Sequence, residues 1–281
     1  MPVTAVLALA AGRPVEAAPG PAVSPAGAQR YPRQMRPPPT SRADRIVAGL
    51  AVAGLVAGGL IIAAQRARTT QFVYVSGLGA QGSQTAEWFR WGFVCVVAGL
   101  AGVAWTLRDV HSRGSLLDLW RPALSLVVAT GCFLVASQVN CSAGCPLAFT
   151  PAAAARDAVH IVAAVLGFAA GAWAMLQLAT ATDRWLARIS ALSGVLVAVI
   201  AGAGGLLSLF GANTDLGSTL EYIATGIGLA WLVTVTVVHV RQGPATVVVG
   251  HRASAPRQPP ADPGPSVSSE KVSGTTSVWT R

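Results

Sequence analysis

The chain has 281 residues, of which 53% are hydrophobic and only 11% are charged. Charged residues make up about a quarter of a typical soluble domain, so this composition excludes an ordinary soluble protein. The formal net charge of +9 would suit nucleic-acid binding, but the placement of the charges points to a different origin.

The two ends of the chain differ in composition from the middle. Residues 1–42 are rich in Ala, Pro and Gly, and residues 242–281 are rich in Pro, Ser and Thr. Neither segment can bury enough apolar surface to offset its chain entropy, so we expect two disordered tails. Residues 3–11 resemble the core of a signal peptide but lack a basic segment before them, so a cytoplasmic tail is the favoured interpretation.

Six apolar stretches lie between these tails, each close to the length of about 20 residues that crosses a 30 Å hydrocarbon core. They are Ile46–Gln65, Trp88–Leu107, Pro122–Val139, Ala158–Ala179, Ile189–Phe210 and Leu220–Val240. The expected fold class is therefore all-α: an integral membrane bundle of six transmembrane helices. It forms one domain over residues 43–241.

The basic residues alternate between the two sides of these spans. With the N-terminus placed in the cytoplasm, sixteen of the 20 Lys and Arg residues fall on the cytoplasmic side. This bias follows the positive-inside rule and predicts that both termini are cytoplasmic. The net charge is then a topology signal; membrane lipid is the expected partner, and nucleic acid is not. Abundant Arg, Ala, Gly and Val are typical of a high-GC bacterium, which indicates a bacterial plasma membrane.

Small residues recur at a spacing of four within the spans. The pairs are Gly54 and Gly58, Ala98 and Gly102, Gly167 and Gly171, and Ala198 and Gly202. Helices in lipid associate through close van der Waals packing, which small residues permit. Such pairs form either a dimer face or contacts inside the bundle, and their presence on four helices favours the bundle.

Two cysteines flank a short loop on the predicted outer side. Cys141 and Cys145 are separated by three residues, and Gly144 and Pro146 favour a turn there. Thiols in an exocytoplasmic loop oxidise more readily than intracellular thiols, so we predict a disulfide. A metal site is the weaker alternative, because only a distant His160 is available to complete the ligand set.

The three helices that begin on the outer side each start at an acid, namely Glu87, Asp157 and Glu221. Free backbone N–H groups and the helix dipole explain each acid singly. In a second hypothesis the three acids form an acidic ring, which is a site for a cation, a proton relay or a lipid head group. Asp157 and His160 share one helix face, either as an acid–base or ligand-binding pair, or as an N-cap residue beside an interfacial histidine.

Motifs for soluble-type catalysis or cofactor binding are missing from the sequence. It contains no HExxH, GxSxG, P-loop or dinucleotide fingerprint. His160 and His239 belong to different spans and fall at opposite membrane faces, which the length of a spanning helix separates by about 30 Å. They therefore do not share a metal or a haem. We expect no cofactor, no metal site and no assigned catalytic residue.

Two loop motifs resemble a known family. The first loop contains Val75–Ala80, and the third contains Cys141–Pro146 followed by Asp157 and His160. Over about residues 45–240 this pattern resembles the bacterial six-helix membrane family catalogued as domain of unknown function nine-nine-eight, although Ser142 stands where that family often has Asp. The family name carries no activity. The resemblance implies the six-helix fold, the outer-loop cysteines, and a meeting of the first loop with the Asp157/His160 pair.

The candidate site on the outer face comprises Asp157, His160, Glu87, Glu221 and Ser76. The leading hypothesis is a non-enzymatic membrane protein that binds or moves a lipid or small ligand at its exocytoplasmic face. One alternative is a membrane-embedded enzyme acting on lipid head groups, with His160 as general base oriented by Asp157. Another is an assembly subunit whose tails contact cytoplasmic partners; the sequence identifies no protein partner.

Overall fold

The computed structural model describes residues 41–70, 73–113, 116–146, 150–210 and 214–242. Over these residues it contains six α-helices, one short 3-10 helix and no strand. The α-helices are α1 (Arg42–Ala67), α2 (Ala86–Thr106), α3 (Pro122–Gln138), α4 (Ala155–Leu178), α5 (Arg184–Leu209) and α6 (Thr214–Gln242), and the 3-10 helix is η1 (Ser76–Gly79). The predicted all-α fold class is confirmed; the two predicted tails lie outside the described residues except at their inner edges.

Each predicted apolar stretch forms one helix, and every helix except α3 begins two to six residues before its apolar stretch. Helix α1 begins at a capping box, in which the Asp44 N–H donates to Ser41 Oγ at 3.1 Å and the Ser41 N–H donates to Asp44 Oδ2 at 3.2 Å. At α5, the Leu186 N–H donates to Asp183 Oδ1 at 2.7 Å. Hydropathy locates the apolar middle of a helix, whereas polar caps extend its ends.

Five of the helices are long and apolar enough to cross a membrane, and α3 is shorter, with 17 residues. Many large apolar side chains on these helices point outward. Leu50 is 69% exposed, Leu60 66% and Leu192 62%. A soluble monomer rarely exposes contiguous apolar surface on this scale, so the outer surface of the bundle is suited to lipid.

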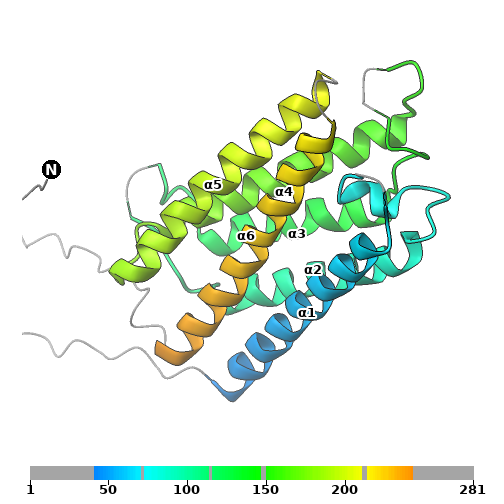
Figure 1. Cartoon of the computed structure of the whole chain (residues 1–281). Coiled ribbons are helices and arrows are strands. Elements are labelled where there is room, and N and C mark those ends of the chain that lie inside the picture. The colour runs from blue at the N-terminus through cyan, green and yellow to red at the C-terminus, as the bar shows by residue number, and fades with distance from the viewer. Residues whose placement is uncertain (1–40, 71–72, 114–115, 147–149, 211–213, 243–281) are drawn as a thin grey trace, which may run out of the picture. The chain divides into compact units, whose positions relative to one another are not determined.

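The helices form a closed ring in chain order (Figure 1). Each helix packs against the next, and α6 packs back against α1. The described residues of the loops between α1 and α2 and between α3 and α4 therefore lie at one end of the bundle, which we call the disulfide end. Those of the loops between α2 and α3 and between α4 and α5 lie at the other end, which we call the opposite end.

Glycines let α1 and α2 approach closely. A Cβ atom added at Gly54 would lie 3.0 Å from the carbonyl oxygen of Cys95. One added at Gly58 would collide with the carbonyl oxygen of Gly92 and lie 2.9 Å from the amide nitrogen of Val96. The interpretation of this glycine pair as packing inside the bundle is confirmed.

The other small-residue pairs divide between packed and open positions. A Cβ atom at Gly102 would lie 2.7 Å from that of Ala51, and one at Gly167 would lie 2.8 Å from the ring of Phe133. At Gly171 and Gly202, by contrast, a Cβ atom would meet nothing within 4 Å. The packing interpretation is wrong for Gly202, which is exposed, and Gly171 lines an internal cavity rather than a close helix contact.

A buried amide fixes the loop at the opposite end. Gln177 on α4 is 1% exposed, and its Nε2 donates to the carbonyl oxygens of Leu117 at 3.0 Å and Trp120 at 2.6 Å. Its Oε1 accepts from Ser125 Oγ at 2.7 Å. One side chain of α4 thus holds the connection between α2 and α3.

We expect Gly58→Ala to destabilise the bundle, because its Cβ would meet backbone atoms of α2, which cannot turn aside as a side chain can. Overpacking of this kind costs about 1–3 kcal/mol. The measurement is the apparent melting temperature of the detergent-purified protein. Gly49→Ala is the matched control on the same helix, since a Cβ there meets nothing within 4 Å. Equal melting of the two variants would contradict the close approach.

Candidate functional site

Two loops meet at the disulfide end. The backbone N–H of Gln81 donates to the carbonyl oxygen of Cys141 at 3.0 Å, which joins the loop after α1 to the loop before α4. Within the first loop, Thr85 Oγ1 donates to the carbonyl oxygen of Leu78 at 2.7 Å, and the Leu78 side chain is fully buried. The first loop and the cysteine loop therefore form one cap over the helices.

Cys141 and Cys145 form a disulfide, as predicted, with Cα atoms 5.2 Å apart. Gly144 has φ of 78° and Cys145 has φ of 47°, so the turn between them uses left-handed backbone. Glycine adopts this conformation without steric cost, which explains Gly144 at this position. Cys95 and Cys132 are free thiols within α2 and α3.

Asp157 anchors the cysteine loop to α4. Its Oδ1 accepts from the Ser142 N–H at 2.6 Å, and its Oδ2 accepts from Ser142 Oγ at 3.0 Å and from the Ala154 N–H at 2.8 Å. The residue is fully buried, and Ala154 rather than Asp157 is the N-cap. Asp157 instead reaches back from the first turn of α4 to bind the loop.

His160 lies one turn further along α4 but binds a different partner. Its Nδ1 lies 2.8 Å from the carbonyl oxygen of Val139. A carbonyl only accepts, so Nδ1 carries the hydrogen and Nε2 is the acceptor of the neutral ring. Both oxygens of Asp157 are engaged by the loop. The structure therefore places the two residues on one helix without joining them as an acid–base pair.

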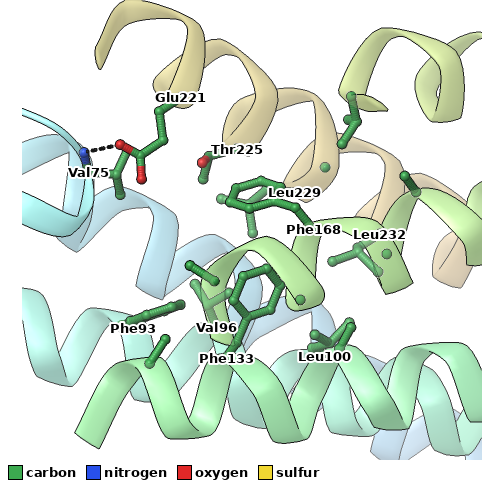
Figure 2. A pocket seen from close by; sticks show the side chains of 18 of the residues that line it. Val75, Phe93, Val96, Leu100, Phe133, Phe168, Glu221, Thr225, Leu229 and Leu232 are labelled. Atoms are coloured by element: carbon green, nitrogen blue, oxygen red, sulfur yellow. Dashed lines mark hydrogen bonds between the residues drawn. The ribbon is translucent and has the colours of Figure 1, made fainter. Parts of the chain in front are cut away.

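Glu221 links α6 to the first loop. Its Oε2 accepts from the backbone N–H of Val75 at 2.9 Å (Figure 2). Because α6 begins at Thr214, Glu221 lies two turns inside the helix, and its expected position at a helix start is wrong. Glu87 does lie in the first turn of α2, where it is exposed. The three acids therefore have different surroundings and do not form a common ring.

A cavity of about 110 Å³ lies inside the ring of helices, under the first loop, and side chains from all six helices line it. Three of the five predicted site residues, Ser76, His160 and Glu221, line this cavity, whereas Asp157 and Glu87 do not. Thr225, one turn after Glu221, also lines it (Figure 2). The structure thus brings the first loop and His160 to one site.

Most of the cavity wall is apolar. The rings of Phe93 and Phe133 lie 5.9 Å apart between centroids, and those of Phe133 and Phe168 lie 5.4 Å apart, edge to face. On α6, the lining residues run from Glu221 to Leu232, roughly 16 Å at 1.5 Å per residue. The cavity is therefore long, narrow and apolar, with its polar residues Glu221 and Thr225 at one end of the α6 wall (Figure 2).

Sequence reasoning missed Thr225 and the four phenylalanines of the cavity wall, Phe89, Phe93, Phe133 and Phe168. In the sequence they are ordinary residues of apolar helices, and only the packing of α2, α3, α4 and α6 brings them together. No group of three or more His, Cys, Asp and Glu side chains that could hold a metal ion is present among the described residues.

The fold and cavity define a class: a multi-pass helical membrane protein with an internal, mainly apolar site. The family model described as Protein of unknown function (DUF998) matches residues 45–238. The chain therefore belongs to this family, as the loop motifs indicated. Comparison with curated proteins and with solved structures finds no match.

We expect Asp157→Asn to destabilise the cap. The NH2 group of Asn would replace one carboxylate oxygen and would then face N–H or O–H groups that need an acceptor. An unsatisfied buried group costs roughly 1–3 kcal/mol. The measurement is the apparent melting temperature. Glu87→Gln removes an exposed acid from the first turn of α2 and should change stability by less than about 0.5 kcal/mol. A melting temperature unchanged by Asp157→Asn would show that the anchor contributes nothing.

We expect the disulfide to be detectable by thiol labelling. In denaturant without reductant, a maleimide should modify only Cys95 and Cys132, and after reduction it should modify all four cysteines. Replacing both Cys141 and Cys145 by Ser should lower stability by about 2 kcal/mol, the loop-closure value for so short a loop. Modification of four thiols before reduction would contradict the bond.

Proposed function

We propose that all six helices cross the bacterial plasma membrane, with both termini in the cytoplasm and the disulfide end outside. The 17 residues of α3 are at the lower limit of about 17–25 residues for a spanning helix. The excess of basic residues on the cytoplasmic side of this arrangement supports it. A disulfide at the outer end is also consistent with an oxidising compartment.

Exposed tryptophans support the same placement. Trp88 and Trp105 lie near the two ends of α2 and are 57% and 56% exposed. Seventeen residues of helix separate them, roughly 26 Å, which is close to the hydrocarbon thickness of about 30 Å. Tryptophan is enriched at both membrane–water interfaces, where its ring is partly apolar and partly polar.

We propose that the protein binds an amphipathic lipid or small molecule in the central cavity, with the polar group of the ligand at the exocytoplasmic end. The observation that carries this proposal is the cavity, whose wall is apolar except for Ser76, His160, Glu221 and Thr225. Ionisable side chains inside a membrane bundle are costly and usually functional. An engineered apolar cavity of roughly 150 Å³ binds benzene, so this cavity of about 110 Å³ suits one short apolar chain or one small group.

The enzyme alternative has less support. It assigns Asp157 to orient His160, but the Asp157 carboxylate binds Ser142 and Ala154, and His160 binds Val139. A general base without its orienting partner is a weaker hypothesis than a ligand-binding polar group. The alternative of an assembly subunit depends on the two tails, which lie outside the described residues.

We expect Gly228→Leu to abolish ligand retention by filling the cavity. Gly228 lines the cavity, and a Cβ added there meets nothing within 4 Å, so the fold should tolerate the larger residue. The measurement is native mass spectrometry of the protein released from nanodiscs of bacterial lipid. The wild type should retain one bound lipid under conditions that strip surface lipid, and the variant should retain none.

Gly226→Leu is the matched control for this experiment. Gly226 lies two residues away on α6, is exposed, has open space around its Cβ position and does not line the cavity. It should retain the same lipid as the wild type. Identical spectra for the wild type and both variants would reject ligand binding in the cavity.

A further inference from the structure

We propose that the ligand of this cavity is a single-chain amine: an apolar chain with an ammonium group that binds between Glu221 and His160. This inference rests on the proposed ligand-binding function and specifies the chemical class of the ligand. It follows from the hydrogen-bonding capacity of the polar end of the cavity and from the charges that line it.

Glu221 supplies the charge argument. A carboxylate has acceptor sites for about four hydrogen bonds; Val75 occupies one of them at Oε2, and the backbone N–H of Ser76 also interacts with the carboxylate. None of the residues that line the cavity is Arg or Lys. Arg66, at the end of α1, donates to Thr69 and lies over the ring of Tyr222 at 5.8 Å, and it is not part of the lining. A carboxylate in apolar surroundings is costly without a cation, and a bound ammonium supplies that cation.

His160 supplies a second acceptor. Since its Nδ1 donates to Val139, the free acceptor of the neutral ring is Nε2. The hydroxyl groups of Ser76 and Thr225 both donate and accept. With the His160 ring neutral, the cavity therefore holds two groups that need donors, and no Arg or Lys that would bind an anion lines it. An ammonium group, with three N–H donors and a positive charge, satisfies both requirements.

The apolar wall of the cavity determines which ligand tail fits, and the charges of the lining residues argue against a phosphate group. The wall between Phe93, Phe133, Phe168 and Leu232 is apolar and narrow, so it suits one alkyl chain. A phosphate group is normally bound by Arg, Lys or backbone N–H groups, and no Arg or Lys lines this site. A free amine fits the site better than the head group of a phospholipid.

The test is a competition assay on the full chain in phosphatidylcholine nanodiscs. Radiolabelled octylamine is bound and then displaced by unlabelled octylamine, octanol or octanoate. Binding to the cavity is defined as the part lost in Gly228→Leu. We expect octylamine to compete at about tenfold lower concentration than octanol, as a charge-assisted hydrogen bond predicts, and octanoate to compete least.

Glu221→Gln tests the counter-ion directly, because its amide oxygen can still accept from Val75. We expect octylamine to bind about tenfold more weakly to this variant and octanol to bind as it does to the wild type, which also shows that the variant is folded. Glu87→Gln removes an exposed acid from the same end of the bundle and should leave the amine preference unchanged. If Glu221→Gln fails to fold, the relative competition by octylamine, octanol and octanoate on the wild type still tests the amine inference.

Each outcome has one reading. Equal affinity for octylamine and octanol, tighter binding of octanoate, or an unchanged amine preference in folded Glu221→Gln overturns the amine inference and leaves ligand binding standing. If Gly228→Leu removes no binding of any of the three, the proposed function itself fails. Lysophosphatidylethanolamine separates two sources of the ammonium. Competition equal to that of octylamine indicates a lipid head group, and weaker competition indicates a free amine.

Discussion

A bundle in lipid has no water in its interior, so a buried polar group needs a partner within the protein. An unsatisfied group in such surroundings costs several kcal/mol. Three polar side chains at the disulfide end meet that constraint by binding the backbone of a loop rather than another helix. Asp157 binds the amide of Ser142, His160 binds the carbonyl of Val139, and Glu221 binds the amide of Val75. The helices therefore hold the loops, and Val75 and Ser76 of the first loop line the cavity.

Helix α4 contributes to this arrangement at both ends. Asp157 anchors the cysteine loop at the disulfide end, and Gln177 anchors the loop between α2 and α3 at the opposite end. Both side chains are buried, and twenty residues of helix separate them, roughly 30 Å. That distance equals the thickness of the hydrocarbon core. The spacing of the two anchors thus matches the thickness of a hydrocarbon core, so a polar residue at each position is compatible with a helix that is apolar between them.

The sequence predicted the helices well and the site only in part. Six apolar stretches gave six helices, because hydropathy reflects the burial of a span in lipid. Hydropathy did not give the start of α6, because residues 214–219 are polar or small apart from Leu216, yet helical. Glu221 was therefore assigned to a helix end. The disulfide followed from local loop chemistry. The pairing of Asp157 with His160 was inferred from helical spacing, whereas their actual partners come from a loop that spacing does not reveal.

Glu221 has two roles that a single carboxylate can perform together. Donation by Val75 holds the first loop against α6, and the carboxylate also lines the cavity. Because a carboxylate accepts several hydrogen bonds, a ligand donor does not have to displace Val75. Ligand binding would then add a contact to the group that fastens the cap, and the occupied protein would resist opening at this loop more than the empty one. A ligand that competed with Val75 for the same oxygen would have the reverse effect, since it would release the first loop. With the proposed ligand binding at this carboxylate, the stability of the cap would depend on the occupancy of the cavity.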